Sequence, residues 1–166
     1  MKITNVQKVS YPQCRFIGKR YVDGDRLNNG SFGHKWGEFF QNGWFEPLEK
    51  LGGLAEAGDA YVGLMRDADP FEYWIGMFFP SDTEAPEGYT YVDIPATDYA
   101  ICWLYGDEKT GELYGMDAHE RCVNAAKEHG MARKDGGWAF ELYNCPRFTT
   151  PDEHGNVVLD YGIEIE

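Results

Sequence analysis

The sequence predicts an α+β fold made of two similar modules, each a helix on a small antiparallel sheet. Helical and β-like segments alternate, so that each half of the chain runs strand, helix, strand, strand. Hydrophobic residues make up 43% of the 166 residues, which is enough for a packed core. The last two strands of each half can also be aligned with each other: "YVGLM" with "AFELY", and "FEYWIG" with "LDYGIE".

The first half begins with a predicted strand, "CRFIGKRYVDG", which a polar, glycine-rich segment follows. Residues 34–53 carry aromatic residues at helical spacing. Gly43 and Pro47 are expected to divide this segment into a helix and a shorter second turn. Two β-like runs close the half: "DAYVGLMRDA" and "FEYWIGMFFP".

The second half begins with one strand-like run, "GYTYVDIPATDYAICWLYGD". Residues 115–130 predict a helix of three to four turns that ends at Gly130. "WAFELYNCPRF" and "NVVLDYGIEIE" are the closing strands. The inner stripe of the helix is expected to consist of Met116, Cys122, Val123 and Ala126. Alternation in the last strand predicts that Leu159, Tyr161, Ile163 and Ile165 point inward.

We therefore expect a single domain over residues 1–166, with module one at about 1–80 and module two at about 87–166. The proline-rich segment "PSDTEAPEG" joins the two modules. A cavity for a ligand is expected in a cleft between them.

The chain is strongly acidic, and this bounds its partners. Fifteen lysine and arginine residues against 28 aspartate and glutamate residues give a formal net charge of −13, and no basic run is present. Nucleic acids and anionic membranes would be repelled, so neither is expected as a partner. The overall field would attract a cationic ligand, although an acidic surface also serves simply to keep a protein soluble.

Cysteine and histidine usage points away from metal and cofactor chemistry. None of the four cysteines is spaced as C-x-x-C, and the four histidines share no ligand spacing with them, so no metal site is expected. Phosphate-binding loops and hydrolase motifs are missing, and no cofactor is expected. Without a signal peptide or an apolar span, a cytoplasmic protein with reduced, mostly buried cysteines is the simplest prediction.

Glu141 is the most unusual residue of the sequence, because it lies in the middle of an apolar strand, "GGWAFELYNCPRF". It shares a strand face with Tyr143, and the alignment of the two halves sets it against Gly63. The carboxylate could face water, meet a buried partner, or await a ligand. An unpaired buried carboxylate is costly, so burial of Glu141 would favour a function.

The aromatic residues allow two interpretations. Rings at regular spacing usually belong to the core, but the large number of rings could also line a cleft for a flat or cationic molecule. Trp103 and Tyr105 share one strand face. Tyr73 and Trp74 must point to opposite faces of their strand, so one of them is expected outside the core.

Several segments together resemble the GyrI-like small-molecule-binding domain, which is also the effector-binding domain of AraC- and MerR-type transcription regulators. The most specific piece is Ile94-Pro95-Ala96 followed by Tyr99-Ala100, and the second is Glu141 with Tyr143. The resemblance spans nearly the whole chain. Its other segments are "RFIGKR", "FEYWIG", "PEGYTYVDIPATDYAICWLYG", "FELYNCPRF" and "LDYGIEI".

This resemblance implies a tandem duplication with a ligand cleft between the copies. In the regulators a buried glutamate meets lipophilic cations between aromatic rings, and Glu141 matches that position. No helix-turn-helix precedes the domain, so direct contact with DNA is not expected. The candidate ligand-binding residues are Glu141, Phe40, Trp44, Trp74, Trp103, Tyr105 and Tyr161.

The expected function is a stand-alone, multidrug-type binding protein for lipophilic, flat aromatic or cationic compounds, acting as a monomer or weak dimer. One alternative, which similar stand-alone proteins suggest, is a hydrolase of electrophilic, cyclopropane-type compounds with Glu141 as acid or base. Tyr143 would then steady a substrate oxygen, because side chains two positions apart on a strand are about 6.6 Å apart. A second alternative is a protein–protein inhibitor of the gyrase type.

Overall fold

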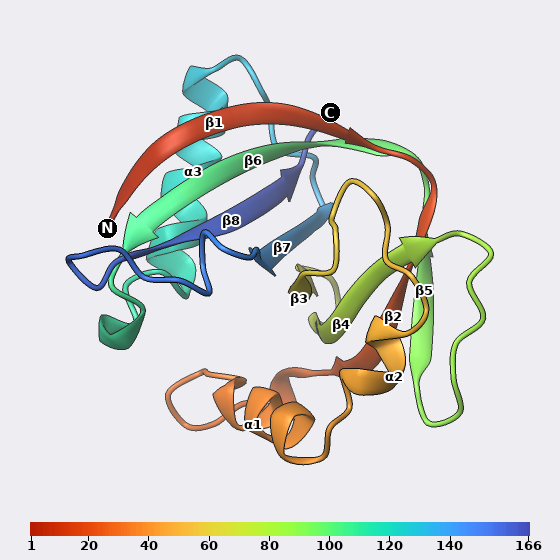
Figure 1. Ribbon diagram of the computed structural model, residues 1–166. Helices are drawn as coiled ribbons and strands as arrows, with labels where there is room; N and C mark the ends of the chain where they lie inside the picture. The colour runs from red at the N-terminus through yellow and green to blue at the C-terminus, as the bar shows by residue number, and fades with distance from the viewer.

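The computed structural model describes residues 1–166 and has an α+β fold, which confirms the predicted class (Figure 1). All eight strands belong to one antiparallel sheet, in the order β1-β6-β8-β7-β3-β4-β2-β5. The strands are β1 (Lys2–Tyr11), β2 (Cys14–Tyr21), β3 (Tyr61–Arg66), β4 (Glu72–Pro80), β5 (Thr90–Ile94), β6 (Thr97–Gly106), β7 (Trp138–Tyr143) and β8 (Val157–Glu164). The helices are η1 (Asp23–Asp25), α1 (Gly33–Gln41), α2 (Glu46–Glu49), η2 (Glu108–Thr110) and α3 (Met116–Glu128).

The sheet differs from the prediction in two respects. β3 pairs with β7, so the two expected small sheets are one continuous sheet, and Gly63 lies directly opposite Glu141 in this pairing. Two strands were not predicted separately. β1 is an edge strand of mixed polarity, which has no clear alternation, and β5 is separated from β6 only by Pro95 and Ala96.

The β3–β7 pair lies in the middle of the sheet, with three strands on each side. One side continues β4-β2-β5, and the other continues β8-β6-β1. The outermost strand of each side comes from the other half of the chain, since β5 pairs with β2 and β1 pairs with β6. The tandem duplication of the two halves remains a prediction.

The helices begin and end close to where the sequence predicts. Gly43 separates α1 from α2 and has a φ of +65°, a conformation that favours glycine. α3 is followed by Gly130 at a φ of +77°. Its inner stripe contains Ala118, Cys122 and Ala126. Met116 was expected there but is 68% exposed, because it is the first residue of the helix and lies beyond the sheet that the helix covers.

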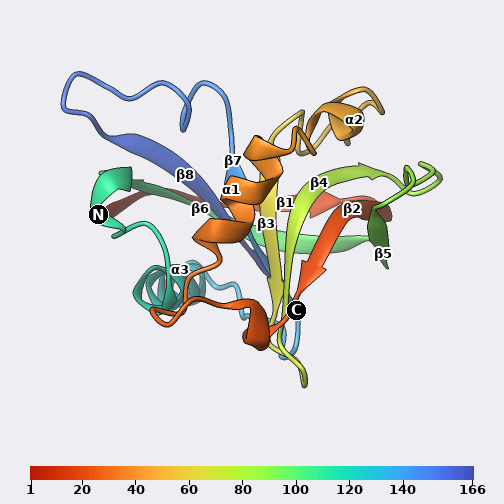
Figure 2. The same cartoon turned by 90° about the horizontal axis from the view of Figure 1, so that it is seen from below.

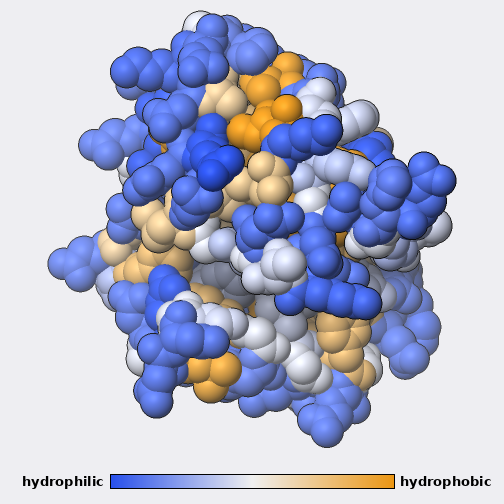
Figure 3. Space-filling model, turned by 90° about the vertical axis from the view of Figure 1, so that its left-hand side faces the viewer, coloured by the Kyte–Doolittle hydropathy of each residue, from blue (hydrophilic) through white to orange (hydrophobic).

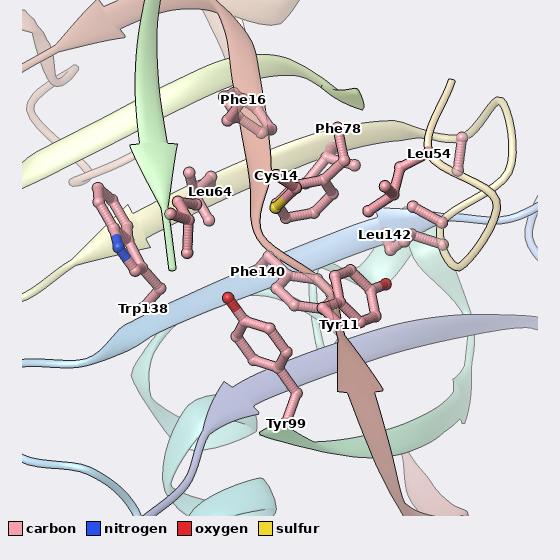
Figure 4. Close-up of a cluster of buried hydrophobic side chains, with 14 of the residues drawn as sticks. Tyr11, Cys14, Phe16, Leu54, Leu64, Phe78, Tyr99, Trp138, Phe140 and Leu142 are labelled. Atoms are coloured by element: carbon pink, nitrogen blue, oxygen red, sulfur yellow. The ribbon is translucent and has the colours of Figure 1, made fainter. Parts of the chain in front are cut away.

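Both faces of the sheet are buried, and one expectation fails for this reason. On the helix side, one apolar cluster includes Phe39 and Tyr73, and another includes Tyr161 and Ile163. On the opposite face, rings such as Phe140 pack together under the strongly curved sheet and the loop that carries Leu54 (Figure 4).

Tyr73 and Trp74 point to opposite faces, as predicted, yet both are buried, so neither lies outside the core. In β8 the residues Leu159, Tyr161 and Ile163 face the helix side as expected, and the alternating Asp160 and Glu164 are buried as well. Strand alternation alone cannot distinguish a solvated face from a second buried face.

The buried acids of the opposite face are all paired with basic residues. Glu72 accepts hydrogen bonds from Arg20 at 2.7 Å and from the Nε of Arg66 at 2.8 Å. Asp160 is paired with Arg147 at 2.6 Å. Glu164 is paired with Lys134 at 3.1 Å and accepts a backbone hydrogen bond from Trp138.

All four cysteines are free thiols. Cys14, Cys102 and Cys122 are buried, as expected, and Cys145 is exposed. None of the helices combines the length and apolar composition that crossing a bilayer requires.

Gly162→Ala is expected to lower the free energy of unfolding by about 1–3 kcal/mol. Gly162 on β8 lies beneath the ring of Phe140, and a Cβ atom there would come within 2.3 Å of that ring. Urea unfolding monitored by circular dichroism measures the change. Gly37→Ala in α1 is the control, because its Cβ meets no atom within 4 Å and alanine favours the helix. Equal stability of Gly162→Ala and the wild type would contradict the packing of Phe140 on β8.

Candidate functional site

Glu141 lies at the centre of the sheet, on the face that the helices cover. Its strand, β7, lies between β3 and β8, where Gly63 and Tyr161 are its direct neighbours in register. The residue is only 7% exposed. The sequence left open whether this carboxylate faces water or is buried, and the structure places it inside.

Two tyrosine hydroxyls donate hydrogen bonds to Oε2 of Glu141. The hydroxyl of Tyr143 is 2.8 Å away, and that of Tyr73 is 3.5 Å away. The separation of about 6.6 Å expected from strand geometry holds for positions on the backbone, not for long side chains that lean along the strand. Tyr143 therefore binds the carboxylate itself and does not stand apart from it to hold a substrate oxygen.

Gly63 provides the space in which these groups meet. A Cβ atom at this position would lie 2.6 Å from the hydroxyl of Tyr73 and 3.1 Å from Oε2 of Glu141. Tyr73 belongs to β4, two strands away from β7, and reaches the carboxylate across the bare backbone of Gly63 on β3. Glycine at this position is what brings Tyr73 and Glu141 together.

Each of the two main helices contributes one side chain to the tyrosines around Glu141. The indole Nε1 of Trp36, on α1, donates to the hydroxyl of Tyr73 at 2.9 Å, and its ring packs edge-on against Tyr143. Nδ1 of His119, on α3, forms a hydrogen bond of 2.8 Å with the hydroxyl of Tyr161. Figure 2 shows α1 crossing the middle of the sheet near β7 and β3, with α3 beside it.

Burial sets the protonation of the cluster. Desolvation raises the pKa of Glu141 to about 7, although the hydrogen bonds from Tyr143 and Tyr73 act in the opposite direction. Burial, and after it the charge of Glu141, hold the pKa of Tyr73, Tyr143 and Tyr161 well above the usual range. These phenols stay protonated and act as hydrogen-bond donors. No lysine, arginine or histidine forms an ion pair with Glu141.

Several aromatic rings of the protein are covered by basic side chains. Lys19 lies 4.4 Å from Trp44, Arg66 lies 4.2 Å from Trp138, and Arg147 lies 4.4 Å from Trp103. The rings of the Glu141 cluster carry no such cation; they are Trp36, Tyr73, Tyr143 and Tyr161. The chain thus has one aromatic cluster with a buried carboxylate and no internal cation.

Of the candidate residues from the sequence, the structure brings Glu141, Tyr143 and Tyr161 together. Trp74 and Trp103 lie on the opposite face of the sheet, because they alternate with residues that face the helices.

The other three candidates lie outside the cluster. Tyr105 is bonded to Asp152 near the end of β6. Trp44 packs on Phe39 below Lys19. Phe40 is 61% exposed on the outer side of α1.

Tyr73, Trp36 and His119 were not among the candidates. The alignment of "FEYWIG" with "LDYGIE" sets Tyr73 against Tyr161, and it contained the signal for Tyr73. For Trp36 and His119 the sequence contained no comparable signal, because helical spacing does not reveal which residue turns toward a particular strand.

Glu141 is covered by other side chains in this structure. A surface groove lies away from it, between β1 and α3, and residues such as Lys2, Asn5, Arg121 and Asn124 line it. The face seen in Figure 3 is largely hydrophilic, with apolar residues in small groups. The expected ligand cleft is therefore a cluster covered by side chains, with Trp36 and His119 over the tyrosines.

Comparison with known proteins identifies the fold. No protein-family model and no curated protein sequence matches the chain. A putative transcription regulation protein from Staphylococcus aureus MU50 matches with a TM-score of 0.70 at 15% identity, over 98% of both chains. SAV2435, solved bound to tetraphenylphosphonium, matches with a TM-score of 0.72 at 15% identity, over 98% of this chain and 94% of its own. The C-terminal domain of EcmrR matches with a TM-score of 0.60 at 12% identity, over 100% and 99%.

The chain has the fold of GyrI-like domains. The resemblance expected from the sequence motifs is thus confirmed at the level of the fold, over nearly the whole chain. At 12–15% identity these matches concern the arrangement of strands and helices and not the ligand.

Glu141→Gln is expected to stabilise the protein at alkaline pH. The folded wild type holds the proton of Glu141 with a pKa of about 7, against 4.5 for the ordinary value. A raised pKa means that stability is highest below pH 4.5 and falls as pH rises through 7, by about 3 kcal/mol in total. The variant carries no such loss, so urea unfolding at pH 4.5 and 8.5 should show similar stability at the lower pH and a more stable variant at the higher.

Glu72→Gln is expected to have the opposite effect on the stability of the protein. Burial alone would raise the pKa of Glu72, but hydrogen bonds from Arg20 and Arg66 lower it overall. Removing this charge should destabilise the protein at neutral pH, because two arginines lose their partner. A wild type whose pH dependence matches that of Glu141→Gln would show that the Glu141 carboxylate is not desolvated.

Proposed function

We propose that this protein binds lipophilic cations, including flat aromatic ones, at Glu141. One observation carries the proposal: a buried carboxylate is surrounded by aromatic rings, no basic side chain forms an ion pair with it, and no lysine or arginine lies over those rings. A bound cation would supply the missing charge. The phenol and indole rings would meet its apolar groups with their electron-rich faces.

Proton linkage follows from the same geometry. In the free protein, burial raises the pKa of Glu141 to about 7, so the neutral acid is populated at neutral and lower pH. A cation next to the carboxylate favours the ionised form, so binding releases a proton below pH 7. The affinity for a permanent cation should therefore rise with pH until Glu141 is fully ionised.

The fold comparison supports the proposal. SAV2435 was solved bound to tetraphenylphosphonium, a lipophilic cation, and its fold covers nearly all of this chain. The net charge of −13 would attract such a ligand. The same charge would repel nucleic acids, and the proposal includes no contact with them. We place the protein in the cytoplasm, where its free cysteines would stay reduced.

Entry of a ligand requires movement of the side chains that cover Glu141. Trp36 is held there by its hydrogen bond to Tyr73 and its edge contact with Tyr143. We propose that Trp36 swings away with α1 and that the ligand takes its place over the tyrosines. The proposal also extends to the origin of the site: α1 with Tyr73 and α3 with Tyr161 would be corresponding parts of a duplicated module, and superposition of the two halves tests this.

Titration with tetraphenylphosphonium tests the binding site, with tryptophan fluorescence and calorimetry as readouts. Glu141→Gln is expected to weaken binding by about 1–3 kcal/mol, the range for the loss of a charged partner. Tetraphenylborate has the same shape and the opposite charge, and it should bind to neither protein.

Glu153→Gln is the matched control, because it makes the same change of net charge at an exposed side chain. It should bind as the wild type does. Equal affinity of the wild type and Glu141→Gln would remove Glu141 from the site, and binding of tetraphenylborate would show that the site does not select cations.

A second candidate function is the opening of an electrophilic ring by water. One observation favours it: with a pKa of about 7, Glu141 can take up and release a proton at neutral pH. Incubation with a cyclopropane-bearing alkylating compound should then give a ring-opened product in mass spectrometry, and Glu141→Gln should not form it. A stoichiometric complex without product, or equal product from the variant, would leave binding alone.

A further inference from the structure

His119 is the one ionisable group, apart from Glu141 and the tyrosines, that is hydrogen-bonded into the cluster. It is half-buried on α3, and its Nδ1 lies 2.8 Å from the hydroxyl of Tyr161. Tyr161 in turn is the direct neighbour of Glu141 in the pairing of β7 with β8. The imidazole is therefore separated from the carboxylate by a single side chain.

The protonation of His119 determines where the hydroxyl proton of Tyr161 points. A neutral imidazole can accept this proton at Nδ1, which fixes the tyrosine ring against α3. An imidazolium has a proton on both nitrogens, so Nδ1 must donate to the oxygen of Tyr161. The hydroxyl proton then turns away from α3, and the only other partner that Tyr161 has is the sulfur of Met65, at 3.7 Å.

The partial burial of His119 favours its neutral form. Burial is the main cause that lowers its pKa, and Arg133 acts in the same direction. Glu120 and Asp67 act in the opposite direction, yet the pKa lies below its ordinary value. The groups that bind Glu141 or pair with it across the strands are phenols: Tyr73, Tyr143 and Tyr161. The charge of Glu141 also raises the pKa of Tyr114, after burial.

We propose that His119 is a specificity-determining residue of the cation site: as a neutral imidazole it holds Tyr161 in place beside a bound cation, and as an imidazolium it excludes that cation. The proposal rests on cation binding at Glu141. Trp36 cannot take this part, because its indole only donates and does not titrate near neutral pH. Trp36 on α1 thus covers the site with a fixed hydrogen-bond donor, and His119 on α3 covers it with a group whose protonation can change.

The expected effect is a second proton linked to binding. Protonation of His119 should lower the affinity for a cation on the order of tenfold, since a unit charge is added close to the site. By reciprocity, a bound cation must lower the pKa of His119. Affinity should therefore rise with pH more steeply than the release of one proton from Glu141 allows.

Affinity for tetraphenylphosphonium, measured by calorimetry between pH 5 and pH 8.5, tests this. This ligand has a permanent charge, so every linked proton belongs to the protein. In the wild type, more protons should be released for each cation bound below pH 6.5 than the ionisation of Glu141 alone supplies. His119→Asn keeps a polar group near the position of Nδ1 but does not titrate, and it should release at most one.

His129→Asn is the control, because His129 lies at the end of the same helix and bonds to the backbone of Ala125. Its pH profile should match the wild type. Nuclear magnetic resonance adds a direct readout, because the pKa of His119 should fall when tetraphenylphosphonium saturates the protein.

The outcomes separate the two proposals. If Glu141→Gln weakens binding but His119→Asn keeps the wild-type pH profile, or the pKa of His119 does not fall on binding, the role of His119 is overturned and cation binding at Glu141 stands. If Glu141→Gln binds as tightly as the wild type, cation binding at Glu141 fails, and the role of His119 fails with it.

Discussion

The structure of the site depends on the hydrogen bonds that hold a buried carboxylate between tyrosines. Glu141 has Tyr143 and Tyr73 as its hydrogen-bond partners, and both are neutral donors. Neutral donors stabilise a carboxylate less than a cation would, which leaves its pKa near 7. Gly63 makes room for this arrangement, and Trp36 fixes it from above. The contact between Tyr73 and Glu141 needs the pairing of β3 with β7, where the two halves of the chain meet.

The other buried acids of the same sheet, unlike Glu141, have charged partners. Glu72, Asp160 and Glu164 all meet arginine or lysine on the face opposite the helices, where their role is to hold neighbouring strands together. A buried ion pair that is already complete has no charge left for a ligand. On the helix-side face Glu141 has no basic partner, and no lysine or arginine covers the rings of its cluster, Trp36, Tyr73, Tyr143 and Tyr161. This difference between the two faces distinguishes the ion-paired acids from Glu141, at which we propose that a cation binds.

The sequence predicted the parts of the fold that local periodicity determines. The split between α1 and α2 at Gly43, the end of α3 before Gly130, and the unusual setting of Glu141 were all evident from it. β1 was missed because its mixed polarity suits an edge strand. Trp74 was a candidate and Tyr73 was not, because a strand that is buried on both faces gives no sign of which side holds the site. The contacts of Trp36 and His119 arise only from tertiary packing.

Burial of the Glu141 carboxylate without a cationic partner lowers the free energy of unfolding, and a cationic ligand can offset this loss. Above pH 7 the free protein must hold a desolvated charge, and this lowers its stability. A ligand that binds only the folded state stabilises it by mass action, and a cation here also removes the desolvation penalty of Glu141. A neutral molecule of the same shape gains only the contact with the rings. Discrimination between the two therefore increases with pH, because only the ionised carboxylate distinguishes a cation from its neutral counterpart.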